Sequence, residues 1–531
     1  MNNWLRLALL PQRMKRIACA MVLCLLPLLC FSGAAQGQSN SIGPTYFGLT
    51  TSNPSSSTCD VYWPLTDGVK IGSLGKGVKT AWSFLQKDSG GTIDYTRLDC
   101  YISAAIGPPR VDPPIYTFFQ VPNWAVCFDY GSGGKYGGSG GTPCTPAVNN
   151  NPITGMNYCP NGTATPPWCP GPTYEQLQNV NGDPTDLDVF AQAIATRYAT
   201  DDPGNTHYYE IWNEPDTQIY WEYPSLTVNA DAKALIVQTY WLEQAVNAGD
   251  PHAVFIGPAT SSGGAATDTF IDDFLKDCVT ISGVKGSVCG ASLLNYGSYH
   301  MYPYPTLAKM GGACYDPTLT YTTVECTGQD LITSVTNRQY DFTSNSSITQ
   351  TWMTEGGWQY NSNIIGTPMA TDEMAFVGRY ELILASLGVH RTEWYEWQGC
   401  DLDPGVYGSL YNLSSDSYCT TTGVNPGGTA LGVVIGWLTG STNGSIATTC
   451  TAVTYFGVNG CEDKDGSVWM YSVTEPSGTS ALAAWVWNNS TVSIPKPFEY
   501  RHYIDLTGTT HTIPIISSSV FLTESPILLV P

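Results

Sequence analysis

The sequence predicts an α/β protein, a (β/α)8 (TIM) barrel with a C-terminal antiparallel β-sandwich. Three observations lead to this prediction. Short apolar strands alternate with helical patterns through most of the chain, which is typical of parallel sheets. Eight such strands can be counted, the number that a closed barrel needs. The helical patterns then stop, and alternating runs separated by turn residues follow. The predicted domains are a leader over 1–37, the barrel over 41–440 and the sandwich over 441–531.

The strands and helices of the barrel are predicted from their apolar periodicity. The predicted strands are Tyr46–Thr50, Val78–Ser83, Ile115–Gln120, Tyr208–Asn213, Val254–Pro258, Gly297–Met301, Thr351–Glu355 and Arg391–Gln398. The predicted helices are Asp186–Tyr198, Asp231–Ala248, Thr267–Lys276, Asp372–Leu387 and Thr429–Leu438. An open, doubly wound sheet is the alternative, but no Gly-x-Gly-x-x-Gly turn follows the first strand.

A long segment rich in Gly, Pro, Asn and Cys separates the third predicted strand from the helix that begins at Asp186. Long loops of this kind are usually functional or mobile. On a barrel, the segment would leave the carboxyl end of a strand, which is the face where barrel active sites form. It is either a wall of the site or a plain surface insertion.

The first residues predict export. A basic stretch ending at Arg16 precedes an apolar run from Ile17 to Phe31, and small residues follow, which is the layout of a secretory signal peptide. A retained membrane anchor is the alternative, but Pro27 interrupts the run and the run is short for a span. A lipoprotein site is disfavoured because Leu29, and not a small residue, precedes the nearest cysteine. The predicted location is secreted or periplasmic.

The cysteines agree with export. Three of the 17 fall in the leader, and the remaining 14 are an even number, which in an exported protein suggests disulfides. Connectivity does not follow from sequence, but neighbours along the chain suggest the pairs 59/100, 127/144, 159/169, 278/289, 314/326, 400/419 and 450/461. Zinc is the alternative, yet no pair has Cys-x-x-Cys spacing and the six histidines do not cluster with cysteines. We predict neither metal nor cofactor.

The charge restricts the partners. The 531 residues are 42% hydrophobic and 12% charged, which is the composition of a folded protein. The formal net charge is −22 and the leader is basic, so the mature chain is more acidic still. Such a chain repels nucleic acid and anionic surfaces, and neutral substrates fit it better. We predict no nucleic-acid and no membrane partner, and the sequence makes no prediction of the oligomeric state.

Two predicted strands end in a glutamate. The stretch "YYEIWNEPD" runs from a buried strand into Glu214 and Pro215, and "TWMTEGG" ends in Glu355 before two glycines. A carboxylate at the end of an apolar strand is costly unless the site needs it. The separation of 141 residues fits three βα units, so these would be the fourth and seventh strands, whose ends lie across one pocket. Glu210, deeper in its strand, must be paired or hydrogen-bonded.

Two carboxylates across a sugar-sized cleft are what glycosidic bond hydrolysis requires. One is protonated and donates to the leaving oxygen, and the other is ionised and attacks the sugar or activates water. A separation of about 5–5.5 Å leads to retention of the anomeric configuration, and a wider gap leads to inversion.

These motifs resemble those of a known enzyme clan. "IWNEP" followed by "TEGG" is similar to the clan A retaining glycoside hydrolases. Further stretches resemble family 39, the group of β-xylosidases and α-L-iduronidases: "AWSFLQKDSGGTIDYTRLD", "YTFFQVPNWA", "SYHMYPY", "EWYEWQ" and "VFLTESPILLVP". The resemblance covers nearly the whole mature chain and implies a barrel with an appended β-sandwich. Two departures are Lys79, where an arginine is expected near the substrate, and Gln86, where relatives often have glutamate.

The resemblance implies the catalytic roles. Glu214 would be the acid/base and Glu355 the nucleophile. Asn213 would hydrogen-bond the 2-hydroxyl of the sugar. Either glutamate alone could be an exposed strand-end charge, and it is the two motifs together at barrel spacing that favour a site.

The resemblance also implies substrate-binding residues. His300 and Tyr302, two apart on one strand face, would bracket the nucleophile, with Tyr302 donating to it. Trp397 would form a stacking floor for the sugar, with Trp394 as the alternative register, and Trp82 would lie at the substrate. His300 alone could be a structural histidine, and Trp397 could equally be barrel packing.

The predicted function is that of a secreted retaining glycoside hydrolase, β-xylosidase-like or related, which cleaves neutral plant or microbial oligo- or polysaccharides. One alternative is an endo-acting clan A glycanase. Another is a non-catalytic carbohydrate-binding protein on the same scaffold. A metal-dependent hydrolase lacks the His/Asp cluster that it would need.

Overall fold

The structure is a computed structural model, and it describes barrel strands, helices and C-terminal sheets. The described residues are 41–51, 64–65, 67–77, 80–86, 92–119, 186–217, 228–261, 265–281, 283–302, 331–357, 370–399, 408–412, 422–447, 468–486, 491–496 and 499–531. The predicted signal peptide and the long segment after the third strand lie outside these residues. Within them, no helix is both long and apolar enough to cross a membrane.

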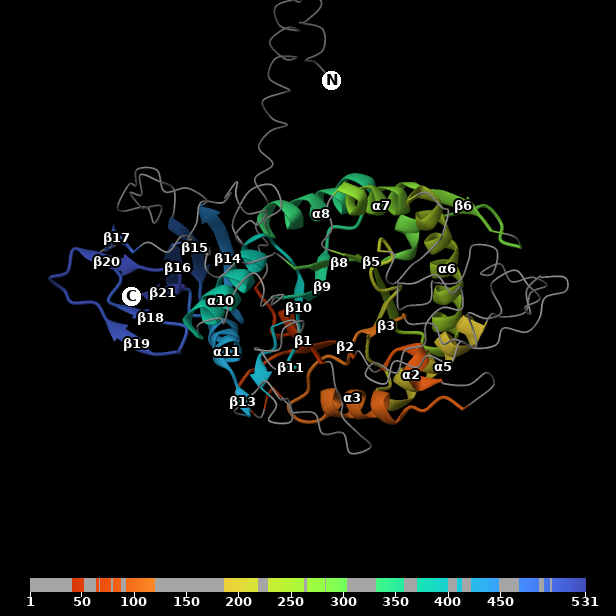
Figure 1. The fold of residues 1–531 in the computed structure, drawn as a ribbon, viewed down its shortest axis with the longest axis horizontal. Helices are drawn as coiled ribbons and strands as arrows, with labels where there is room; N and C mark the ends of the chain where they lie inside the picture. Colours follow the sequence, from red (N-terminus) through yellow and green to blue (C-terminus); the bar gives the residue numbers. More distant parts are fainter. Residues whose placement is uncertain are drawn as a thin grey trace, which may run out of the picture.

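Eight parallel strands form the barrel (Figure 1). In chain order they are β1 (Phe47–Thr51), β2 (Ser73–Gly77), β3 (Tyr116–Thr117), β4 (His207–Glu210), β5 (Ala253–Thr260), β8 (Tyr296–Met301), β9 (Thr351–Gly356) and β10 (Arg391–Tyr395). Their neighbours pair in the order β2-β1-β10-β9-β8-β5-β4-β3. The Ile115 N–H donates to the Leu74 carbonyl at 3.1 Å and so links the two edges, β3 and β2. The predicted barrel is confirmed.

Helices cover the outside of the barrel (Figure 1). They are α2 (Trp82–Leu85), α3 (Thr96–Ile106), α5 (Asp186–Asp201), α6 (Val228–Gly249), α7 (Ala265–Lys276), α8 (Leu331–Asn345), α10 (Ala370–Ser386) and α11 (Pro426–Leu438), with short 3-10 turns η2 (Pro44–Tyr46) and η4 (Gly290–Leu293). The five predicted helices are present with their ends shifted by a few residues. The helices α3 and α8 were not predicted, because Thr, Ser, Asn and Cys in them weaken the helical signal.

One predicted strand is wrong. The second strand is β2 over Ser73–Gly77, and not Val78–Ser83. Its sequence, "SLGKG", lacks the β-branched and aromatic residues that mark strands. Trp82, which the prediction placed in a strand, begins the helix α2.

The interior of the barrel below its carboxyl end is polar. Glu210 accepts hydrogen bonds from Thr117 at 2.8 Å and from Ser298 at 3.0 Å, as expected of a buried carboxylate. Glu393, from β10, accepts one from Ser73 at 2.9 Å. A Cβ atom at Gly48 would lie 1.8 Å from a carboxylate oxygen of Glu393, so a larger residue there would displace the carboxylate. Burial raises the pKa of Glu393 to about 8. This polar layer lies below the site.

The C-terminal part is built from antiparallel sheets, as predicted. The larger sheet has the order β14-β15-β16-β21-β18-β19, and a second sheet pairs β17 with β20. The strands are β14 (Thr442–Ala447), β15 (Val468–Thr474), β16 (Ser480–Val486), β17 (Val492–Pro495), β18 (His502–Ile504), β19 (Thr510–Thr512), β20 (Ser519–Leu522) and β21 (Ile527–Val530). The larger sheet lies beside α10 and α11 (Figure 1), and its Trp469 and Trp485 belong to the core that it shares with the barrel. Because the C-terminal sheet and the barrel share this core, no break in packing marks the predicted domain boundary at 441, and the boundary stays a prediction.

One predicted disulfide is confirmed. Cys278 and Cys289 are bonded and join the ends of a hairpin formed by β6 (Cys278–Thr280) and β7 (Ser287–Cys289). Cys100 is disulfide-bonded as well. The other predicted pairs lie outside the described residues.

Three further short strands follow the last barrel strand: β11 (Gln398–Gly399), β12 (Tyr411–Asn412) and β13 (Gly423–Val424).

Candidate active site

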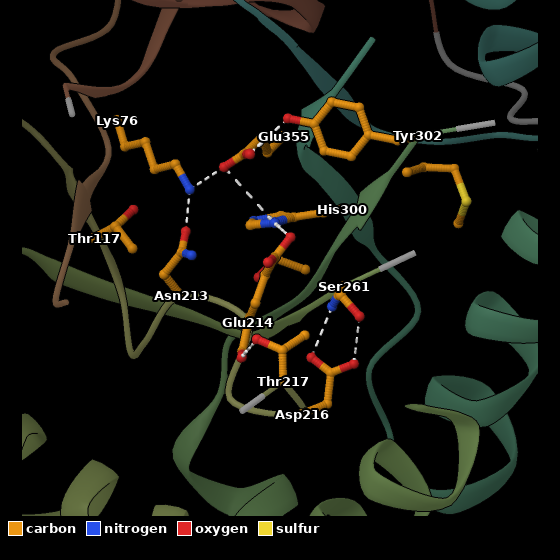
Figure 2. A network of polar contacts seen from close by, with 12 residues as sticks. Lys76, Thr117, Asn213, Glu214, Asp216, Thr217, Ser261, His300, Tyr302 and Glu355 are labelled. Atoms are coloured by element: carbon orange, nitrogen blue, oxygen red, sulfur yellow. Dashed lines mark hydrogen bonds and ion pairs between the residues drawn. The ribbon is translucent and has the colours of Figure 1, made fainter. Parts of the chain in front are cut away.

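Three side chains from three barrel strands meet at the carboxyl end of the barrel (Figure 2). Glu214 follows β4, His300 lies on β8 and Glu355 lies on β9. His300 Nδ1 is 2.9 Å from Glu214 Oε1 and 3.7 Å from Glu355 Oε2. One side-chain N or O atom of each residue lies within 4.8 Å of the others. The structure thus brings together the two glutamates that stand 141 residues apart in the sequence.

A register shift turns Glu355 into the barrel. On β8, Tyr299 and His300 are consecutive, but their partners on β9 are Met353 and Glu355, so Thr354 is an extra residue in β9. Side chains alternate along a regular strand, and an extra residue re-aims those that follow it. This bulge puts Glu355 on the same side as His300.

Glu214 adopts a left-handed backbone conformation. Its φ is 45°, and Ala259 on the neighbouring strand has a φ of 52°. The Glu214 N–H donates to the Ala259 carbonyl at 2.9 Å and locks these two residues together. For residues other than glycine such conformations cost about 1–3 kcal/mol each and persist where the surrounding structure fixes them.

Lys76 is a site residue that the sequence analysis missed. Its ammonium donates to Asn213 Oδ1 and forms an ion pair with Glu355 (Figure 2). Neighbouring residues of a regular strand face opposite sides, but the pairing of β1 with β2 shifts by one residue between Leu74 and Gly77. Because of this shift, Gly75 and Lys76 both face the interior of the barrel. Lys79, which the sequence analysis placed near the substrate where an arginine was expected, lies outside the described residues.

Charges set the ionisation of the site. Burial raises the pKa of Glu355, but Lys76, His300 and the hydrogen bond from Tyr302 outweigh it, so that the pKa is lowered. Burial and the positive charge of Lys76 both lower the pKa of His300. The carboxylates of Glu355 and Glu214 raise it by more, so that the pKa of His300 is raised overall. Glu355 is therefore ionised over a wide pH range, and the imidazole keeps its proton more readily than a free histidine does.

The donor types of this cluster would also suit a metal ion. Glu214, His300 and Glu355 offer carboxylate and imidazole atoms of the kind that hold zinc. The Lys76 ammonium already rests on Glu355, however, and it would repel a second cation there. The cluster fits an ion pair of the protein's own groups better than a metal site.

No protein-family model matches the chain, and no curated protein matches it. Solved structures do match. One is a family 39 glycoside hydrolase from the gut symbiont Bacteroides cellulosilyticus WH2, with 16% identity, 92% of this chain and 81% of that chain covered, and a TM-score of 0.56. Another is the catalytic domain of a family 30 xylanase C from Talaromyces cellulolyticus, with 11% identity, 93% and 98% covered, and a TM-score of 0.50.

The chain has the fold of these glycoside hydrolases. The resemblance to family 39 that the sequence suggested is thus confirmed at the level of the fold.

In this glycoside hydrolase fold, Tyr302 and Asn213 complete the surroundings of the carboxylates. The Tyr302 hydroxyl donates to Glu355 Oε1 at 2.6 Å, which is the contact that the sequence analysis expected. Asn213 has its Oδ1 turned to Lys76, so its amide NH2 group is directed away from the lysine. An NH2 group in that place can donate to a ligand hydroxyl.

The predicted tryptophans lie in packed surroundings. Trp82 stacks on Phe190 of α5, with ring centroids 5.2 Å apart. Trp394 packs on the outside of the barrel against Tyr380 of α10, at 5.3 Å, so it does not form the floor of the site. Trp397 is fully buried at the end of β10. The roles of Trp82 and Trp397 in sugar binding stay predictions.

Proposed function

We propose that the chain is a retaining glycoside hydrolase that cleaves neutral oligo- or polysaccharides by double displacement. The observation that carries this proposal is the approach of the two carboxyl groups, with an oxygen of Glu214 and one of Glu355 within 4.8 Å of each other. Retaining enzymes hold their two carboxyl groups about 5–5.5 Å apart, because one attacks the sugar directly, whereas inverting enzymes leave room for a water.

Glu355 is the nucleophile in this proposal. It would attack the anomeric carbon and form a covalent glycosyl-enzyme while the glycosidic bond breaks. The ion pair with Lys76 and the hydrogen bond from Tyr302 support this role, because both favour the ionised carboxylate. Tyr302 would also hold the carboxylate in one rotamer.

Glu214 is the acid/base. It would give its proton to the leaving oxygen and would then take a proton from the water that hydrolyses the glycosyl-enzyme. Its side chain is 16% exposed, so water can reach it. His300 holds Glu214 Oε1 in place, and the Asn213 amide would donate to the 2-hydroxyl of the sugar.

The proposal includes export. The basic and apolar leader and the bonded Cys278 and Cys289 support a secreted or periplasmic enzyme, since disulfides persist in oxidising compartments. A β-xylosidase-like activity is the first to be tested, with an endo-acting glycanase as the alternative. Chromatography of the products from plant polysaccharides separates the two, because exo action releases single sugars.

The test begins with a panel of aryl glycosides. We expect Glu355→Ala to lose at least about 10⁴-fold in kcat and azide to restore turnover with an inverted glycosyl azide as product. Glu214→Ala should slow substrates with poor leaving groups far more than activated ones. NMR of the first-formed sugar should show retention in the wild type. Near-wild-type rates in both variants would refute the assignment, and binding without turnover across the panel would favour the non-catalytic alternative.

A further inference from the structure

Asp216 lies two residues after Glu214 and joins two strand ends (Figure 2). Its carboxylate accepts the backbone N–H of Ser261 at 2.8 Å and the Ser261 hydroxyl at 2.6 Å. Ser261 follows directly on β5, so the contact joins the ends of the fourth and fifth strands of the barrel. The buried guanidinium of Arg338 on α8 interacts electrostatically with the same carboxylate.

This contact lies beside the strained backbone of the site. Glu214 and Ala259 both have left-handed backbones, and they are tied to each other by one hydrogen bond. Ala259 is also the extra residue of a bulge, because Pro258 and Thr260 pair with consecutive residues of β8. The turn from Glu214 to Thr217 is held by two further hydrogen bonds. The Thr217 N–H and the Thr217 hydroxyl both donate to the Glu214 carbonyl, each at 3.0 Å. The Asp216–Ser261 contact and the Glu214–Ala259 hydrogen bond therefore join the same two short backbone segments, and these segments contain both left-handed residues.

We infer that the Asp216–Ser261 pair is a positioning clasp that aims Glu214 at the leaving-group oxygen. The inference rests on the proposed acid/base role of Glu214. A left-handed residue relaxes to an ordinary backbone conformation when the contacts that hold it are released. Relaxation would rotate the Cα–Cβ bond of Glu214 and move its carboxyl group away from His300. Proton donation depends on geometry at hydrogen-bond distance, so this step suffers first.

The test uses leaving groups of different acidity on the sugar that the wild type prefers. A 2,4-dinitrophenyl glycoside leaves without protonation, whereas a methyl or phenyl glycoside needs the acid. We expect Asp216→Asn to lower kcat/KM about tenfold or more for the poor leaving groups and less than about threefold for the dinitrophenyl glycoside. Ser261→Ala keeps the backbone N–H donor and should show the same pattern with a smaller loss.

Asp505→Asn is the matched control. Asp505 also accepts backbone N–H groups and a hydroxyl, from Thr507 and Thr509, but it lies after β18 in the C-terminal sheet. It has the same kind of turn contacts and no connection to Glu214. We expect its rates to be unchanged for all leaving groups. Thermal unfolding of each variant shows whether it is folded at the assay temperature.

The outcomes separate the two claims. If Glu214→Ala shows the leaving-group dependence and the Asp216 and Ser261 variants lose rate equally for all leaving groups, the clasp has only a structural role and the inference is wrong. If Glu214→Ala shows no such dependence, the proposed function itself fails. A folded Ser261→Ala protein decides the matter even if Asp216→Asn does not fold.

Discussion

The barrel holds two buried histidines, each set between two carboxylates, at opposite ends of its strands. His207 begins β4, with its Nδ1 2.6 Å from Asp250 and its Nε2 3.5 Å from Asp202. His300, near the end of β8, lies 2.9 Å from Glu214 and 3.7 Å from Glu355. By residue type and distance alone, either cluster could be taken for a catalytic site.

The two clusters differ in access and in strain. The carboxylates beside His207 are 0% and 4% exposed, and those beside His300 are 16% and 11% exposed. The Tyr209 hydroxyl also binds Asp250, at 2.9 Å, so that cluster is closed by its own contacts. Among the residues that the structure describes, the left-handed residues other than glycine are Glu214 and Ala259, both at the His300 end. Backbone strain is concentrated at functional sites, so solvent access together with strain favours the His300 cluster as the site.

The first prediction sets the two histidines against each other. We expect His300→Gln to lower kcat/KM by about 10²-fold, because Glu214 loses the group that holds it. His207→Gln should leave kcat/KM within about threefold but lower the free energy of unfolding by about 1–3 kcal/mol, since it disturbs the hydrogen bond between His207 and the buried Asp250. Kinetics and urea unfolding of both variants test this. A large loss of activity in a folded His207 variant would overturn the comparison.

The second prediction concerns Lys76, a buried lysine that is 5% exposed, whereas Arg110, the cation that pairs with Asp202 in the His207 cluster, is 44% exposed. Removing its charge should raise the pKa of Glu355, because Lys76 is the largest of the interactions that lower it. Since Glu355 as the proposed nucleophile must be ionised, we expect Lys76→Met to move the acid limb of kcat/KM upward by about one pH unit and to lower the maximum about tenfold.

Two variants serve as controls for Lys76→Met. Lys76→Arg keeps the charge and should keep the acid limb in place. Lys276→Met removes an exposed lysine that pairs with Asp272, and it should change neither limb nor maximum. An unmoved acid limb in Lys76→Met would show that the lysine does not set the ionisation of Glu355.

The sequence predicted the barrel strands that are marked by runs of apolar residues. Apolar runs gave β4, β8, β9 and β10, and the two-residue spacing of His300 and Tyr302 put both on one strand face. The strand β2 was misplaced because the glycines that make room for Glu393 and Thr50 also remove the apolar signal of a strand.

The bulges explain why the site was predicted only in part. A period of two residues would point Thr354, and not Glu355, into the barrel. Motif resemblance found Glu355 in spite of this, whereas Lys76, which stands next to another bulge and in no recognised motif, was missed. Local irregularity of this kind depends on the pairing of strands far apart in the sequence, so no single stretch encodes it.

The third prediction uses the buried acid below the site. The native state keeps the Glu393 proton to about pH 8, whereas the unfolded chain loses it near pH 4.5. Between these values the native state binds more protons, so the free energy of unfolding falls with rising pH by roughly 1.4 kcal/mol per pH unit from this group. We expect Glu393→Gln to remove that slope in urea titrations between pH 5 and about pH 8. Glu499→Gln, at an exposed glutamate, should leave the slope as it is.

The smallest predicted effect is a gain of stability at the site itself. Asparagine tolerates a left-handed backbone better than glutamate does. We expect Glu214→Asn to raise the free energy of unfolding by about 1 kcal/mol while it abolishes acid/base function. Asp250→Asn at the His207 end carries no such strain and should lower stability instead, because Asp250 binds both His207 and Tyr209. Equal losses of stability in the two variants would mean that the strain at Glu214 has no measurable energy, and the distinction between the two clusters would then rest on solvent access alone.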